Sequence, residues 1–188
     1  MSNRLTTLVN TIKGNVLVFF PSYAMRDQLY PQIKTSKQLI LEKQGSTKEQ
    51  KKHLLKEFGK HKDKGAVLLA TSSGNFGEGI DLPGDLLQGV IIVGLPLQPP
   101  DIETLELIKY YDNKFSKGKL YGYVFPAFMR IIQNAGRLIR TETDRGVIVF
   151  MDNRYIWPSY KQCFPPEYDL IIGKTEEYVE KIKEFFSS

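Results

Sequence analysis

Five short apolar runs predict β-strands along the chain. They span residues 15–20, 38–41, 66–71, 90–93 and 147–151. Runs of this length that are bounded by turn residues are typical of strands whose two faces are both covered, as in a mainly parallel sheet. Pro21 closes the first run and Gly146 precedes the last, as expected at strand ends.

Apolar residues spaced three and four apart predict helices between these runs. The expected helices span residues 23–34, 46–58, 102–111, 125–139 and 175–186. Ser22 can cap the first helix, and Pro31 is expected to end or kink it. In the second helix, Ser46 with Glu49 three residues later has the pattern of a capping box, and Gly59 is expected to end the helix.

The alternation of strands and helices predicts the fold class. It indicates an α/β domain with a mainly parallel sheet and helices on both faces, whose functional loops lie outside the carboxyl ends of the strands. The glycine-rich stretch 72–84 follows such a strand end. A chain of 188 residues with 41% hydrophobic content is expected to form one domain, residues 1–188. Regular structure weakens after Asp152, so a less regular C-terminal extension is expected from about 155–188.

Composition and charge exclude several classes of protein. The single cysteine, Cys163, cannot form an internal disulfide, and neither it nor His53 or His61 has metal-ligand spacing, so no metal site is predicted. The formal charge of +5 suits a polyanionic partner but is also common in ordinary proteins, and the lysines between residues 48 and 64 are interpreted as a solvated face. No membrane span and no secretion signal are recognised, which predicts an intracellular protein, in the cytoplasm of a prokaryote or the nucleus of a eukaryote.

Candidate chemistry lies in the fourth predicted helix. Gln133, Arg137 and Arg140 are spaced i, i+4 and i+7, so on a helix they would share one face. Gly136 beside them is unfavourable inside a helix, which suggests a close approach to the backbone, for example by a phosphate chain. Two such guanidinium groups can neutralise charge on a transferred γ-phosphoryl group. Taken alone, a solvated basic face explains the pattern better, since such spacing is common.

The order of three segments changes that interpretation. Residues 16–23 (VLVFFPSY) resemble helicase motif IV, residues 77–81 (GEGID) resemble motif V, and residues 133–140 (QNAGRLIR) resemble motif VI. Two further segments, residues 90–96 and 146–154, are similar to the same family. The chain therefore resembles, over roughly residues 14–160, the second motor domain of the XPD-like (XPD/DinG) superfamily 2 DNA helicases. The resemblance implies a RecA-like fold.

The resemblance also implies roles for individual residues. The catalytic pair would be Arg137 and Arg140; the nucleotide side would hold Gln133, Gly136, Glu78, Gly79 and Asp81; and the nucleic-acid side would hold Ser22, Tyr23, Ser72, Ser73 and Gly74. Structural alternatives stay open: tight turns for the glycines, a helix cap for Asp81, an N-cap for Ser22 and a half-buried aromatic for Tyr23. The family often carries basic residues where Ser73 and Asn75 stand, so neutral contacts would replace a charged phosphate grip there.

The sequence contains no Gly-x-x-x-x-Gly-Lys-Ser/Thr motif and no Asp-Glu-Ala-His box. The resemblance therefore implies half of a motor, sharing ATP with Mg²⁺ with the N-terminal helicase domain of the same parent chain. The family's iron–sulfur cluster is expected only in that other half.

The expected function is 5′–3′ DNA unwinding in repair, with single-stranded DNA and repair-complex proteins as partners. The isolated chain is expected to be inactive. The alternatives are a standalone nucleic-acid or protein-binding module without ATPase activity and, more weakly, an unrelated phosphate-binding α/β enzyme.

Overall fold

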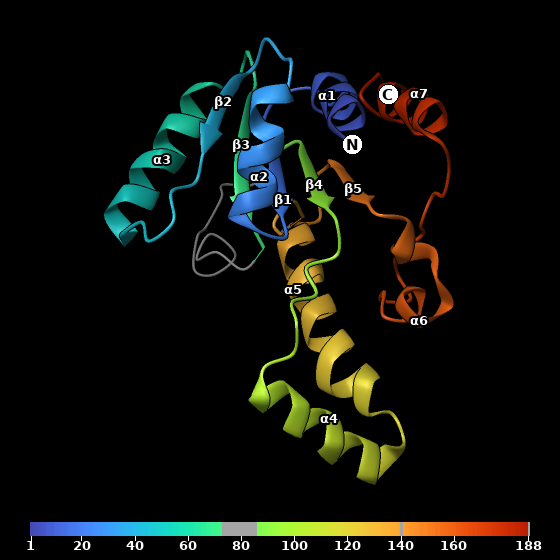
Figure 1. Cartoon of the computed structure of the whole chain (residues 1–188). Coiled ribbons are helices and arrows are strands. Elements are labelled where there is room, and N and C mark those ends of the chain that lie inside the picture. Colours follow the sequence, from blue (N-terminus) through green and yellow to red (C-terminus); the bar gives the residue numbers. More distant parts are fainter. Residues whose placement is uncertain (73–85, 140, 188) are drawn as a thin grey trace.

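The computed structural model describes residues 1–72, 86–139 and 141–187 (Figure 1). All five predicted strands are present within these ranges. They are β1 (Val16–Phe20), β2 (Gln38–Leu41), β3 (Ala66–Thr71), β4 (Gly89–Val93) and β5 (Val147–Met151). The strands pair in parallel in the order β2-β3-β1-β4-β5. The predicted parallel α/β sheet is confirmed.

The three central strands are buried along their whole length, which explains their continuous apolar sequences. Successive side chains point to opposite faces of the sheet. In β1, Leu17 and Phe19 enter one core while Val16, Val18 and Phe20 enter the other. The edge strands β2 and β5 are only partly buried.

Helices cover both faces of the sheet (Figure 1). The core on one side includes residues of α3 (Lys48–Lys60) and α5 (Phe125–Ala135). The core on the other side includes residues of α1 (Ser2–Thr11), α2 (Tyr23–Leu29) and α7 (Thr175–Phe185), and α1 and α7 lie side by side. Helix α1 is absent from the predicted elements, although Leu5, Leu8 and Val9 have helical spacing and are buried.

Several helix boundaries differ from the sequence-based prediction; α4, for example, runs to Phe115 rather than to residue 111. The capping box of α3 uses Thr47 and Gln50 rather than Ser46 and Glu49: the Thr47 hydroxyl accepts from Gln50 N at 3.2 Å, and Gln50 Oε1 accepts from Thr47 N at 2.9 Å. Gly59 does not end this helix, which continues to Lys60, because one glycine costs only about 1 kcal/mol in a helix.

Near Pro31 the prediction is confirmed: α2 gives way to a 3₁₀ turn, Tyr30–Gln32.

A further difference concerns α5. Its hydrophobic spacing predicts a helix to residue 139, but the helix ends at Ala135 with Gly136 as its C-cap. Glycine is a poor helix former and favours helix ends, so the local signal at Gly136 outweighs the apolar spacing of the residues after it. Arg137 therefore lies in a turn, so the prediction that Gln133 and Arg137 share one helical face is wrong; Arg140, the third residue of the predicted strip, lies outside the described residues.

Helices α4 (Ile102–Phe115) and α5 form a hairpin that extends beyond the sheet (Figure 1). No residue of α4 is fully buried. A π-helical segment, Leu120–Val124, leads into α5. Gly118 and Gly122 allow close packing here, because an added Cβ would lie 2.3 Å from Ile108 O at Gly118 and 2.7 Å from Ile108 N at Gly122.

The chain after β5 packs back on the domain. It forms a 3₁₀ turn (Asn153–Ile156) and the short helix α6 (Pro158–Lys161) before α7. Tyr155 and Phe164 are buried in the same core as Phe128 of α5, and the Tyr155 hydroxyl donates to Gly94 O at 2.8 Å. Burial raises the pKa of Tyr155 far above its ordinary value. Over the residues that the structure describes, no helix is long and apolar enough to cross a membrane.

Candidate nucleotide and nucleic-acid interface

Two predicted site residues, Ser22 and Ser72, lie at neighbouring strand ends on the carboxyl edge of the sheet. Strands β1 and β3 are paired so that Phe20 lies beside Thr71, and Ser72 N donates to Phe20 O at 2.8 Å. Ser22 is two residues beyond Phe20. The structure therefore places Ser22 and Ser72 at neighbouring strand ends, although they lie in distant parts of the sequence. In open α/β sheets, ligands bind outside this edge.

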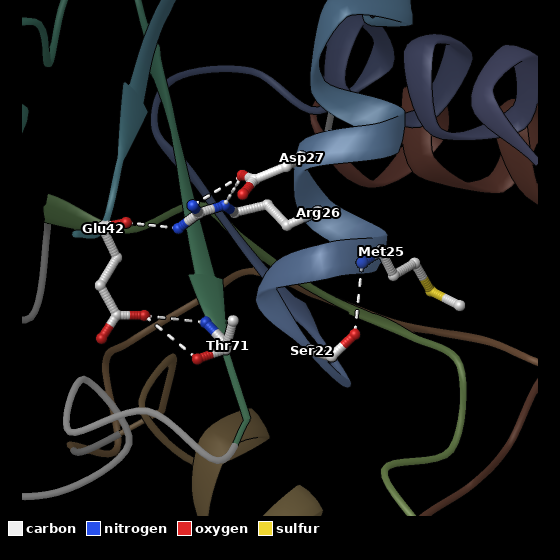
Figure 2. A network of polar contacts seen from close by, with 6 residues as sticks. All are labelled: Ser22, Met25, Arg26, Asp27, Glu42 and Thr71. Carbon is white, nitrogen blue, oxygen red and sulfur yellow. Dashed lines mark hydrogen bonds and ion pairs between the residues drawn. The ribbon is translucent and has the colours of Figure 1, made fainter. Parts of the chain in front are cut away.

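The exposed Ser22 has a structural role. Its hydroxyl oxygen accepts from Met25 N at 3.2 Å and so caps α2, as the structural alternative predicted (Figure 2). A hydroxyl group has two lone pairs and one donor hydrogen, so the cap does not use all of its hydrogen-bonding capacity. Ser22 can cap the helix and still donate to a phosphate oxygen.

Tyr23 is half-buried, and its ring packs against a cation. The guanidinium carbon of Arg26 lies 4.8 Å from the centre of the Tyr23 ring, a cation–π contact. A base that stacks on Tyr23 would therefore have to use the face of the ring that Arg26 leaves open. Arg26 keeps the ring in a defined orientation.

Arg26 itself is buried, with 6% of its surface exposed. Its Nε and Nη2 donate to Asp27 Oδ1 at 2.9 and 2.7 Å, and its Nη1 donates to the backbone carbonyl of Glu42 (Figure 2). These bonds join α2 to the end of β2. The orientation of Tyr23 thus depends on a network that reaches across the sheet edge.

Glu42 extends this network to β3. Its side chain is buried, and Oε2 accepts from the backbone N–H of Thr71 at 2.9 Å and from the Thr71 hydroxyl at 3.4 Å (Figure 2). Sequence reasoning missed this residue. The available signal was a charged residue directly after the apolar run 38–41, at a carboxyl strand end.

The described residues of the segment that resembles motif VI lie at the end of α5 and just after it. Gln133 is exposed in the last turn of the helix, and Gly136 is exposed just after it. Gly136 has φ −64°, which any residue can adopt, and an added Cβ would meet the helix carbonyl of Ile132 at 3.2 Å. Arg137 is half-buried, and desolvation lowers the pKa of its guanidinium from its ordinary value. Leu138 next to it is buried against Gly146 at the start of β5.

The remaining candidates lie outside the described residues. They are Ser73, Gly74, Glu78, Gly79, Asp81 and Arg140. Within the described part of the chain, no group of His, Cys, Asp or Glu side chains could hold a metal ion. Cys163 is buried in the core beside Phe164, and burial raises the pKa of its thiol.

The parallel sheet, the helices on both faces and the polar loops at its carboxyl edge define a RecA-like domain of the kind found in nucleic-acid motors. The chain matches the helicase C-terminal domain family over residues 5–169. It therefore belongs to that family. The matched range includes all three motif segments recognised in the sequence.

Similar curated proteins are helicases. The chain is 33% identical over 171 residues to the probable ATP-dependent helicase MJ0942 of Methanocaldococcus jannaschii, a match that covers 82% of this chain and 26% of the relative. It is 36% identical over 162 residues to the ATP-dependent DNA helicase YoaA of Haemophilus influenzae, covering 85% of this chain and 24% of that protein. The chain thus spans about a quarter of the length of these relatives.

Solved structures agree with the fold. A structure of apo XPD superposes with a TM-score of 0.65 at 26% identity, covering 86% of this chain and 33% of that one. The C-terminal domain of the DEAD-box protein Dbp5 gives a TM-score of 0.61 at 18% identity, covering 97% of this chain and 89% of that domain, which supports the fold alone. The similarity to ATP-dependent DNA helicases does not favour the alternative of a standalone binding module.

Proposed function

We propose that this chain is the second motor domain of an ATP-dependent DNA helicase and acts with the N-terminal helicase domain of the same parent chain. The observation that carries this proposal is the family match over residues 5–169, a range that includes the three segments resembling motifs IV, V and VI. The relatives are described as ATP-dependent DNA helicases. Residues 1–188 would form one RecA-like domain with a less regular extension from about 155–188. The parent would unwind DNA 5′–3′ in repair and would meet repair-complex proteins.

Single-stranded DNA would pass along the carboxyl edge of the sheet. Ser22 supplies an exposed hydroxyl group, Ser72 lies at the neighbouring strand end with its hydroxyl buried in this structure, and Tyr23 supplies an aromatic ring held by Arg26. Hydroxyl groups contact phosphates and aromatic rings stack on bases, so this combination suits binding without sequence preference. Ser73 and Gly74 would continue the same path.

ATP with Mg²⁺ would bind between this domain and its N-terminal partner. Gln133, Gly136 and Arg137 would face the nucleotide from the end of α5, with Arg140, Glu78, Gly79 and Asp81 completing this side. The half-buried guanidinium of Arg137 remains a cation, because arginine does not lose its charge in proteins even when desolvation lowers its pKa. Such a cation can compensate negative charge on a transferred γ-phosphoryl group. An iron–sulfur cluster, where present, would belong to the N-terminal half.

A hydrolysis assay tests the division into two halves. The isolated chain is expected to show no ATP turnover above background with or without single-stranded DNA, since the sequence contains no Gly-x-x-x-x-Gly-Lys-Ser/Thr motif to cradle the β- and γ-phosphates. The longer parent chain is expected to hydrolyse ATP when DNA is added. Turnover by the isolated chain that rivals the parent would contradict the proposal.

A further inference from the structure

A pocket opens where the loop after β4 meets the start of α5. Its volume is about 160 Å³. It is lined by Ser72 from the end of β3, residues 96–101 of the loop, Thr104 of α4, and residues 122, 123, 126, 127 and 130 of the hairpin. A buried cavity of about 150 Å³ holds one benzene molecule, so this space suits a single aromatic ring.

The backbone of the pocket walls has restricted conformational freedom, because proline fixes φ. Four of the lining residues are prolines: Pro96, Pro99, Pro100 and Pro126. The Tyr123 hydroxyl donates to the carbonyl of Gln98, which ties the hairpin to the loop. Tyr123 belongs to the π-helical segment before α5, and π-helical turns occur often at functional sites. These features restrict the shape of the pocket.

The chemistry of the pocket suits a neutral flat ring better than an anion. Pro99 and Pro100 have no backbone N–H, so this part of the loop offers no donors to cradle a phosphate. The carboxylate of Asp101 accepts from Thr104 N at 2.8 Å, and hydrogen bonds from Thr104 lower the pKa of Asp101, so a negative charge stands beside the opening. Proline rings and the Tyr123 ring supply flat apolar surfaces.

Two polar residues complete the pocket. Ser72 is 7% exposed, and its hydroxyl is buried without a hydrogen-bond partner among the described residues. Arg130 is exposed at the rim and forms no ion pair with any described residue. The Ser72 hydroxyl can therefore bond the edge of a ring, while the Arg130 guanidinium can hold a phosphate just outside the pocket.

We propose that this pocket receives one base of single-stranded DNA, with the ring against Tyr123 and the prolines and the adjoining phosphate on Arg130. The inference rests on the proposed function, because Ser72 belongs both to this pocket and to the proposed strand path. It adds a subsite to that path: the strand turns one base out of its stack into the space between the β4–α4 loop and α5.

A pocket-filling variant tests the subsite. Ala127 is half-buried in the wall on α5, and Ala127→Leu fills the space while keeping a good helix former. The matched control is Asn113→Leu, which adds bulk at an exposed α4 position outside the pocket. Fluorescence anisotropy measures the affinity of the chain for labelled oligothymidine and for an abasic strand of the same length, which keeps every phosphate.

Ala127→Leu is expected to weaken oligothymidine binding about fivefold or more, the effect of losing one stacked base, and to leave abasic-strand binding unchanged. Asn113→Leu is expected to change neither. Arg130→Ala is expected to weaken the binding of both strands equally and to reduce the salt dependence of binding by about one phosphate contact.

If wild type and Ala127→Leu bind oligothymidine equally, the base subsite is wrong while strand binding stands. If wild type binds neither strand, the proposed function and the subsite both fall.

Crosslinking gives a second test that needs no variant. The wild-type chain is mixed with a strand that contains 4-thiothymidine, irradiated, digested and mapped by mass spectrometry. Crosslinks to Tyr123 or to residues 96–100 are expected. Crosslinks that fall only outside the pocket would overturn the proposal even if Ala127→Leu fails to fold.

Discussion

The buried carboxylate of Glu42 accepts two hydrogen bonds from Thr71, at 2.9 Å from the backbone N–H and at 3.4 Å from the hydroxyl (Figure 2). The two residues stand at the carboxyl ends of β2 and β3. The next residue, Ser72, is bonded to the end of β1 and lines the pocket. Glu42 therefore fixes the strand end from which Ser72 departs.

Removing the Glu42 carboxylate is expected to destabilise the domain. Glu42→Ala leaves the buried N–H of Thr71 without its acceptor, which costs about 1–3 kcal/mol, whereas Glu42→Gln keeps an acceptor oxygen and is expected to cost less. Thr71→Val removes only the longer hydroxyl bond and serves as the matched control. Urea unfolding measures the free energy of unfolding of all three variants. A Glu42→Ala domain as stable as wild type would show that this bond contributes nothing to the fold.

Tyr23→Ala is expected to weaken binding of single-stranded DNA through the loss of one stack, worth about 1–3 kcal/mol. Tyr23→Phe keeps the ring and is expected to bind nearly as well as wild type. Because Arg26 packs on this ring, Arg26→Met is the informative companion: it removes the cation that orients Tyr23 and is expected to give a smaller loss. Fluorescence anisotropy with labelled oligonucleotide measures the affinity of wild type and of each variant. The stacking role fails if wild type and Tyr23→Ala bind with the same affinity.

The partly buried amino group of Lys37 is expected to make the stability of the domain depend on pH. Its Nζ donates to the carbonyls of Ile12 and Gly14 at 2.5 and 2.7 Å, and burial lowers its pKa to about 8. The unfolded chain, with the ordinary pKa of 10.5, then binds more protons than the folded chain between about pH 8 and 10.5, so the free energy of unfolding rises with pH in that window. The cost of the buried charge is fully present below about pH 8.

Thermal unfolding at a series of pH values checks this. The stability of wild type relative to Lys37→Met is expected to rise above about pH 8. Lys34→Met, at an exposed position nearby, reports the general effect of removing one positive charge. A constant difference between wild type and Lys37→Met across this range would show that Lys37 keeps its proton equally well in both states.

The strands were predictable because their signal is local. A run such as residues 16–20 or 66–71 is apolar at every position, since both faces of a central parallel strand are buried. The location of Ser22 and Ser72 at the same edge of the sheet also follows from the sequence, because the carboxyl ends of parallel strands share one edge. The order of motifs then pointed to the family.

The contacts around the site could not be predicted in the same way. Glu42 and Thr71 are 29 residues apart, and no spacing rule joins them. The pocket combines a proline-rich loop with a π-helical segment, and periodicity does not specify either shape. At the end of α5 the sequence holds two conflicting signals. Apolar Leu138 and Ile139 continue the helical spacing and predict a longer helix, whereas Gly136 marks the actual end.

That helix end changes what the arginines can do. Arg137 stands in a turn and is half-buried, so its guanidinium is held partly by the protein rather than being fully solvated. In the full parent, Arg137→Ala is expected to lower DNA-stimulated ATP hydrolysis by about 10³-fold or more, the range of an arginine finger. Arg140→Ala, at a position outside the described residues, is expected to act similarly.

Three measurements separate a role in hydrolysis from a role in folding. Arg137→Lys keeps the charge but loses the planar fork that can bind two phosphate oxygens, so turnover is expected to stay severely impaired. DNA binding is expected to survive in Arg137→Ala, and urea unfolding reports the stability lost with the half-buried side chain. Lys109→Ala, on the exposed face of α4, is the control and is expected to hydrolyse ATP normally. Normal turnover by both Arg137→Ala and Arg140→Ala would remove the arginine-finger role, because a γ-phosphoryl transition state that loses a compensating cation must form more slowly.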